Sequence, residues 1–196
     1  MMTSRIALLL FVVYLLASCL PSARKPVTDE AKVDSLLAFH SRTLFEDLAE
    51  DFSLDYRPMP VSAKPYSQAP EGCYDAILES LDKLGIKELD TLSWAIEMKR
   101  RTEWDSLFFG DKFKLVPDDT IRSIFADDSR WWGYFNEHIG PGFLRFSLPI
   151  FFNDYHYALV YASENCGGLC GYGAWMIMRR EEKHWVKVDE HCFWIS

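Results

Sequence analysis

Residues 142–163 read GFLRFSLPIFFNDYHYALVYAS, and this stretch decides the fold class of the chain. Every second residue from Leu144 to Ile150 is apolar, which is the period of a strand with one buried face. Asn153-Asp154 then signals a turn. Residues 155–163 are apolar on both faces, which indicates a central strand. The stretch therefore predicts consecutive strands of one sheet.

Further strands are predicted downstream of this stretch. The expected elements are a strand over 173–180, a turn at Glu181-Glu182-Lys183, a strand over 184–189 and a closing strand over 192–195. Because the connections between these strands are short, neighbouring strands are expected to run in opposite directions. The prediction is an antiparallel meander of four to five strands in the C-terminal part.

Helical patterns dominate the chain upstream of the sheet. Apolar residues recur at helical spacing over 33–48, in a helix expected to begin near Thr28. A second helix is expected over about 71–84, where Gly85 suits a C-terminal cap. The other expected elements are a helix from Asp90 or Thr91 toward Trp104, a strand over 112–116, a short helix from Asp119 or Thr120 to Phe125, helical turns over 129–138, and a proline-rich connector over 55–70. Helices first and strands last predict an α+β fold, with N-terminal helices packed on the C-terminal meander.

The N-terminus has the features of an export signal. Arg5 precedes an apolar run from Ile6 to Ala17, and small residues lead to Cys19. The run is shorter than the roughly 20 apolar residues that cross a membrane as a helix. An ordinary signal cleaved near Ala23 and a retained N-terminal anchor are the alternatives.

The segment Leu16-Ala17-Ser18-Cys19 resembles the lipobox of bacterial lipoproteins. The resemblance implies a signal peptide over 1–18 and a lipid on Cys19, with a diacylglyceryl group and an N-acyl chain that together hold a protein stably on a membrane. Leu20 after that cysteine resembles lipoproteins sent to an outer membrane, so the expected location is the cell envelope, on the periplasmic face of the outer membrane. The expected organisation is a tether over 19–27 and a single α+β domain over 28–196, mainly helical over 28–115 and mainly β over 116–196.

Composition limits the classes of partner. The net charge is −8, and removal of residues 1–18 takes away only the charge of Arg5, which gives −9. No basic stripe accompanies this charge, so nucleic acid is not an expected partner. The hydrophobic content of 49% is that of a folded domain. The expected partners are the membrane, through the lipid on Cys19, and a protein or a small polar ligand, with no cofactor and no metal.

The remaining four cysteines are free to pair, because an envelope compartment permits disulfides. They are Cys73, Cys166, Cys170 and Cys192. Cys166 and Cys170 flank Gly167-Gly168-Leu169, where the glycines permit a tight closure, so these two cysteines are expected to form a disulfide. Cys73 and Cys192 are then the residual pair. The three-residue spacing fits neither a C-x-x-C redox motif nor a familiar zinc pattern.

A group of aromatic residues beside carboxylates is the candidate ligand surface. It comprises Trp131, Trp132, Tyr134 and His138, with Asp127, Asp128 and Glu137 next to them. Exposed rings stack on sugars or peptides while carboxylates accept hydrogen bonds, so this surface, together with the loop 166–172, is the expected binding site. The alternative is that the rings pack their helix on the sheet.

No grouping in the sequence identifies a catalytic residue. A nucleophile could be sought in Ser147 with His156 and Asp154, but no G-x-S-x-G motif supports it. A pair of Cys166 with His138 would need a free thiol in an oxidising compartment. The predicted function is therefore a lipid-anchored envelope protein that acts as a binding or interaction module. The alternatives are an enzyme of hydrolase-like class and an envelope inhibitor or immunity-like protein.

The region from about Val116 to Ser196 resembles an uncharacterised family of bacterial secreted proteins and lipoproteins. The similar segments, in chain order, are Asp119–Phe125, Trp132–Phe135, Phe146–Phe151, Asn153-Asp154, Ala158–Tyr161, Cys166–Gly171, Lys183–Trp185 and Trp194–Ser196. Leu148 stands where this family commonly has an arginine. The resemblance implies an α+β envelope protein and assigns no activity to it.

Overall fold

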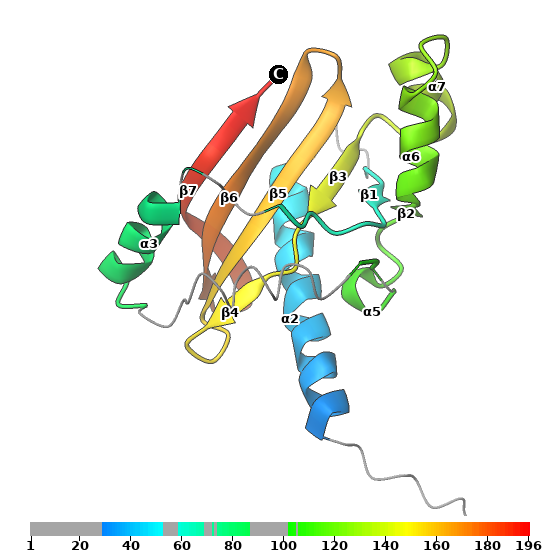
Figure 1. Cartoon of the computed structure of the whole chain (residues 1–196). Helices are drawn as coiled ribbons and strands as arrows, with labels where there is room; N and C mark the ends of the chain where they lie inside the picture. The colour runs from blue at the N-terminus through cyan, green and yellow to red at the C-terminus, as the bar shows by residue number, and fades with distance from the viewer. Residues whose placement is uncertain (1–28, 53–58, 69–71, 73, 87–101, 105) are drawn as a thin grey trace, which may run out of the picture. The chain divides into compact units, whose positions relative to one another are not determined.

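A computed structural model describes residues 29–52, 59–68, 72, 74–86, 102–104 and 106–196 of the chain (Figure 1). The chain divides into two units, Met1–Val33 and Asp34–Ser196, and the packing reported below belongs to the second. Several predicted features lie outside the described residues: the signal peptide over 1–18, Cys19, most of the tether, Cys73 and most of the helix expected from Asp90.

A mixed sheet is the centre of the second unit (Figure 1). Its strands are β1 (Val61–Ser62), β2 (Leu115–Val116), β3 (Phe143–Phe146), β4 (Ile150–Phe152), β5 (Tyr157–Gly167), β6 (Cys170–Glu181) and β7 (His184–Ile195). The spatial order is β2-β1-β3-β5-β6-β7, and β4 pairs with β5 beyond the end of β3. Strand β1 is parallel to β2 and β3, whereas the other pairs are antiparallel.

The helices are α2 (Asp29–Asp51), α3 (Tyr74–Lys83), α5 (Ser106–Phe109), α6 (Asp118–Phe125) and α7 (Trp131–His138). The α+β class is confirmed. Helix α3 ends before Gly85, whose φ of 76° is the left-handed conformation expected of a capping glycine. Helices α6 and α7 lie between β2 and β3 in the chain, so the helices are not confined to the N-terminal part as predicted.

The predicted count of four to five antiparallel strands is wrong, because the sheet has seven. Strands β1 and β2 have only two residues each, too few to display a period, and they join the sheet in parallel. The single strand expected over 144–150 is divided into β3 and β4. The division falls at Ser147-Leu148-Pro149, where proline lacks the N–H that a continuous ladder requires.

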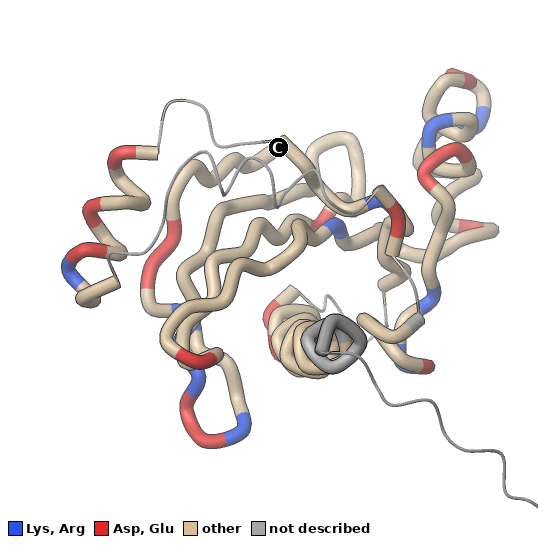
Figure 2. The backbone as a smooth tube through the Cα atoms, turned by 60° about the horizontal axis from the view of Figure 1, so that its bottom comes forward, with Lys and Arg blue, Asp and Glu red and all other residues tan. Residues whose placement is uncertain are grey.

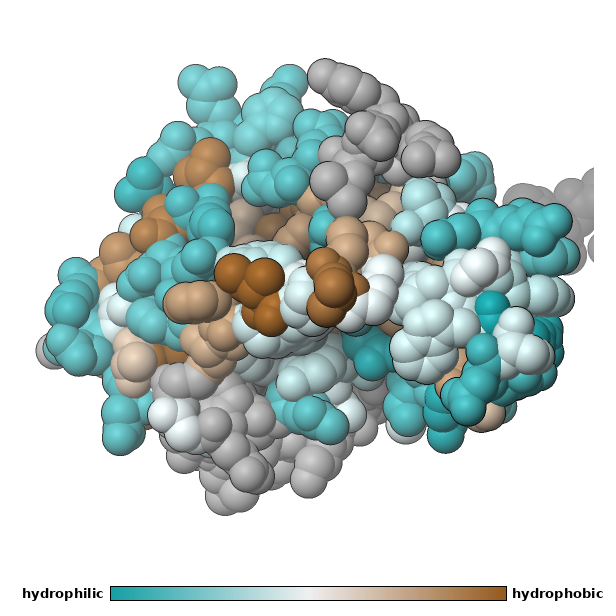
Figure 3. All heavy atoms as spheres, turned by 90° about the horizontal axis from the view of Figure 1, so that it is seen from above, coloured by the Kyte–Doolittle hydropathy of each residue, from teal (hydrophilic) through white to brown (hydrophobic). Residues whose placement is uncertain are grey.

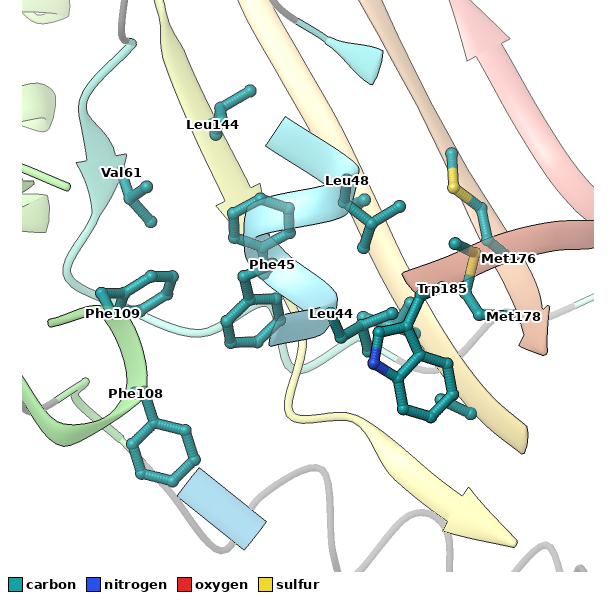
Figure 4. Close-up of a cluster of buried hydrophobic side chains, with 14 of the residues drawn as sticks. Leu44, Phe45, Leu48, Val61, Phe108, Phe109, Leu144, Met176, Met178 and Trp185 are labelled. Atoms are coloured by element: carbon teal, nitrogen blue, oxygen red, sulfur yellow. The ribbon is translucent and has the colours of Figure 1, made fainter. Parts of the chain in front are cut away.

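The main core lies between α2 and one face of the sheet (Figure 4). Leu44, Phe45 and Leu48 of α2 are 1% exposed or less, because they recur at the three- and four-residue spacing of one helix face. The ring of Phe45 stacks on Phe146 of β3 at 4.6 Å between centroids and on Phe109 of α5 at 4.9 Å. Together these contacts fix α2 along the sheet.

The other face of the sheet carries a second core. Ile77 and Leu81 of α3 pack there with Leu159 and Ile177 of the sheet. Successive residues of β5 are thus buried on opposite faces, as the central-strand prediction requires. A third cluster joins α6 and α7 to Phe143 at the start of β3.

Candidate functional site

A groove of about 520 Å³ lies between the C-terminal end of α2 and strands β5 to β7. Its lining residues are Leu48, Asp51, Phe52, Glu164, Tyr172, Met176 and Lys187. Leu48 and Asp51 lie on one face of α2 because they are three positions apart, and Phe52 directly follows the helix. Glu164 of β5 pairs directly with Tyr172 of β6, so both side chains lie on the sheet face that α2 covers.

One wall of the groove is a hydrogen-bonded set on β6 and β7. The Tyr172 hydroxyl donates to Glu190 Oε2 at 2.8 Å, and Lys187 Nζ donates to the same oxygen at 2.5 Å. The Lys187 ammonium, and secondly the tyrosine hydroxyl, lower the pKa of Glu190. Burial, followed by the bond to Glu190, raises the pKa of Tyr172. The positive charge of Lys187 is therefore already matched.

Glu164 is the unmatched acid of the groove. Burial raises the pKa of its carboxyl group, and no cation within the described part of the chain offsets this effect. Asp51 adds a second carboxylate at the end of α2. Counting Asp51, Glu164 and Glu190 against Lys187 gives three acids to one base, a net charge of −2 when all are ionised. Leu48 and Phe52 on the helix side and Met176 on the sheet side add apolar atoms, so acidic and apolar groups are mixed on both sides of the groove.

A disulfide closes the β5–β6 hairpin beside this groove. Cys166 and Cys170 are joined with a Cα–Cα distance of 5.1 Å, as predicted. A carboxylate oxygen of Glu164 lies within 4.8 Å of both sulfurs, but disulfide sulfurs are not thiolate ligands for a metal. Cys192 is also disulfide-bonded, whereas Cys73 lies outside the described residues, so that pairing stays a prediction.

The predicted aromatic surface divides into a buried and an exposed part. Trp132 contacts Phe125, Phe135 and Phe143, and these rings form the third core cluster. Trp131 remains 47% exposed. The ring of Tyr134 stacks on His138 at 4.0 Å, and the Arg130 guanidinium lies 4.0 Å from the same tyrosine ring.

The loop 166–172 carries Leu169, which is 93% exposed. Figure 3 shows hydrophobic residues among polar ones on the face seen from above Figure 1. Among the described residues, no hydrogen bond, ion pair or ring contact joins the α7 side chains to this loop. The aromatic surface and the loop are therefore not shown to act as one site.

The side chains considered for nucleophilic catalysis have structural roles. Ser147 is fully buried, and its hydroxyl accepts a hydrogen bond from the Tyr161 N–H at 2.8 Å. This bond bridges the break between β3 and β4. His156 Nδ1 contacts the Asn153 carbonyl oxygen at 2.7 Å within its own turn. Cys166 has no free thiol because it is in the disulfide.

Sequence reasoning missed a serine, an aspartate and a histidine that meet between α3 and β7. The Ser80 hydroxyl donates to Asp189 Oδ2 at 2.5 Å, and His191 Nε2 lies 3.0 Å from the same hydroxyl. His191 Nε2 also lies 3.2 Å from Asp189 Oδ2. A catalytic triad uses one imidazole nitrogen for serine and the other for aspartate. Here both partners share Nε2, so the group is a polar link between helix and sheet.

Comparison of the chain with protein-family models, with curated proteins and with solved structures gives no match. Within the residues that the structure describes, no helix combines the length and apolar character needed to span a membrane.

Proposed function

We propose that this chain is a lipid-anchored cell-envelope protein whose groove, between the end of α2 and strands β5 to β7, binds a partner. The observation that carries the binding role is the excess of carboxylates beside apolar side chains in one groove. Ligand sites are concave and largely apolar, with a few polar groups that set orientation. A buried carboxyl group with a raised pKa is a further mark of a functional site.

The partner that fits this groove is a basic segment of another protein with apolar side chains. A cation beside Glu164 would offset the cost of its burial and lower its pKa, so binding would recover free energy that the empty groove lacks. Leu48, Phe52 and Met176 are 1%, 8% and 3% exposed, so they supply a narrow apolar contact surface. Figure 2 shows acidic positions on helix α3 as well as on the sheet, and the chain carries a net charge of −8. This charge favours approach of a basic protein.

The envelope location rests on the sequence of residues 1–19. The lipobox-like segment ending at Cys19 supports a lipid anchor, and Leu20 supports the outer membrane. The Cys166–Cys170 disulfide is consistent with an oxidising compartment. An envelope inhibitor or immunity-like role falls within this proposal, since such a protein would bind a basic target through an acidic groove.

Binding of a labelled peptide tests the groove. We expect a fluorescein-labelled peptide of alternating lysine and leucine to bind the full chain, and a glutamate–leucine peptide of equal length not to bind. Added salt should weaken the interaction because it screens the charges. Glu164→Gln should weaken binding about tenfold, or roughly 1.4 kcal/mol. Equal binding of the two peptides would reject the proposed ligand class.

Two control variants locate the peptide. Glu137→Gln removes a carboxylate whose side chain is 78% exposed on α7, and it should leave the dissociation constant unchanged. Trp131→Ala removes the exposed ring of α7, also without effect if the groove is the site. A loss with Trp131→Ala but not with Glu164→Gln would move the site to the aromatic surface and refute the groove.

A further inference from the structure

A second cavity, of about 280 Å³, lies where residues 64–68 face β3 and the start of α6. Its polar lining includes Lys64, Tyr66, Gln68, Asp118, Arg122 and Arg145. Arg145 follows Leu144, which faces α2, so its side chain lies on the opposite sheet face. This cavity therefore shares no lining residue with the groove and lies across the sheet from it.

Backbone contacts hold the segment that forms one side of the cavity. The Ser62 hydroxyl contacts both the N–H and the carbonyl of Lys64, at 3.4 and 3.3 Å. The Tyr66 N–H donates to the Phe146 carbonyl at 2.8 Å, and the Tyr66 ring stacks on Tyr161 at 3.8 Å between centroids. These contacts involve only the backbone of Lys64, whose side chain lines the cavity together with Arg122 and Arg145.

The charges around the cavity are unbalanced toward positive. Asp118 contacts Arg122 Nε at 3.0 Å and Arg145 Nη2 at 3.3 Å, so one carboxylate serves two guanidinium groups. Lys64 has no ion-pair partner among the described residues. Lys64, Arg122 and Arg145 against Asp118 and Asp119 give a local charge of +1 in a chain whose net charge is −8. Arg122 has a further contact with Asp119, which is 94% exposed and therefore strongly hydrated.

Arg145 also has a hydrogen-bond donor that is not used. Its Nε is buried and has no partner, although a buried N–H normally has one. The guanidinium lies near the Phe143 ring, 5.6 Å from its centroid, which leaves its planar edge available for an oxyanion. Because this Nε has almost no accessible surface, the cavity offers a ligand its unmatched positive charge and the exposed part of the Arg145 guanidinium.

We propose that this cavity binds a phosphate group. A phosphate monoester carries about −1.5 to −2 charges at pH 7, opposite in sign to the local charge of +1. Guanidinium groups present paired N–H donors to phosphate oxygens, and a lysine adds a mobile positive charge. The Tyr66 hydroxyl donates to Gln68 Oε1 at 3.3 Å, which leaves the amide N–H groups of Gln68 as further donors. The site is independent of the groove and does not rest on its proposed role.

Isothermal titration calorimetry of the full chain with inorganic phosphate tests the site at constant ionic strength. We expect saturable binding with a stoichiometry of one, and no comparable heat with chloride. Lys64→Gln should weaken binding about tenfold because it removes one phosphate contact. Lys83→Gln, which alters an exposed lysine paired with Glu79 on α3, should have no effect. Equal heats with phosphate and chloride, or equal losses in both variants, would overturn the proposal.

A substitution expected to tighten phosphate binding distinguishes an effect on the site from a loss of folding. Asp118→Asn removes the internal carboxylate that competes for both arginines, so phosphate should bind several-fold more tightly. Weaker binding by this variant, with an unchanged circular dichroism spectrum, would contradict the site. Titration with O-phosphoserine distinguishes the source of the group: tighter binding than inorganic phosphate indicates an esterified ligand, and equal binding indicates free phosphate.

Discussion

The Trp185 indole nitrogen donates a hydrogen bond of 3.1 Å to Thr43 Oγ1, which joins strand β7 to helix α2. The backbone N–H of Trp185 donates to Asp47 Oδ2 at 2.7 Å, one helical turn along. Trp185 is 4% exposed and belongs to the main core. One residue thus provides both the apolar packing and the polar contacts that hold α2 against the last strand.

Loss of this residue should strongly destabilise the fold. Trp185→Ala should lower the free energy of unfolding by about 3–5 kcal/mol, because it leaves a cavity and removes the indole donor to Thr43, whereas the backbone N–H that bonds to Asp47 is retained. Urea denaturation followed by circular dichroism measures the change. Trp131→Ala, at a site 47% exposed, should cost much less. Equal losses in the two variants would contradict the packing.

Alanine substitutions at Gly142 and Gly133 should change the stability of the fold in opposite directions. A Cβ on Gly142 would lie 2.5 Å from the Asn165 carbonyl oxygen and 3.0 Å from Cys166 Cα, so Gly142→Ala should destabilise by about 1–3 kcal/mol. Gly133 lies in α7 with nothing within 4 Å of its built Cβ. Gly133→Ala should therefore stabilise by about 0.5–1 kcal/mol through helix propensity. Thermal melts of both variants give the signs.

The acid in the groove predicts a pH dependence. Because burial raises the pKa of Glu164 in the folded state, folding favours its protonated form. Stability from this residue is present below its unfolded pKa and is lost as pH rises through the folded pKa. Glu164→Gln should therefore gain stability relative to the native chain at pH 7, and this gain should disappear near pH 4. A gain that persists unchanged at low pH would argue against titration of Glu164.

Glu190 should titrate with the opposite sign. Lys187 and Tyr172 lower its pKa in the folded state, so its stabilising effect is present above its unfolded pKa and is lost as pH falls through the folded value. Lys187→Met removes the main cause of this shift. The variant should lose stability at pH 7 and approach the native chain at acidic pH. Denaturant titrations at the two pH values measure the difference.

The lipid anchor is tested by mass and by fractionation. The full-length protein expressed in a Gram-negative bacterium should lose residues 1–18, gain the mass of its acyl groups on Cys19, and sediment with membranes. Cys19→Ala should remain in the soluble fraction or uncleaved, because the acyl chains on Cys19 supply the membrane affinity. An unmodified Cys19 in the mature protein would refute the anchor.

The sequence predicted correctly those structural features that depend on residues close together in the chain. The two-sided burial of β5, the hairpin disulfide and the cap at Gly85 each depend on a few neighbouring residues. The strand expected over 112–116 contains β2, but strand β1 and the parallel pairing of the two could not be predicted. Each has two residues, and its pairing depends on contacts such as Val61 with Leu144, which are far apart in the sequence.

The candidate site was predicted only in part. The predicted loop 166–172 contributes one residue, Tyr172, to the lining of the groove. Glu164, Lys187 and the end of α2 come together only in the folded chain. The alternation of Tyr172, Ala174 and Met176 could have indicated the sheet face, although not the helix that covers it. The Ser80 contact with His191 joins residues 111 positions apart and had no local signal.

The pairing of β3 with β5 places the carboxylate of Glu164 on one face of the sheet and the guanidinium of Arg145 on the other face. Leu144 pairs with Glu164, which faces the groove, and the next pair, Arg145 with Ser163, places the guanidinium on the phosphate side. A shift of one residue would bring an arginine to the acidic side and end the separation. The register of β3 on β5 thus separates the acidic groove from the basic cavity. A basic peptide and phosphate should each bind with the same affinity whether or not the other is present.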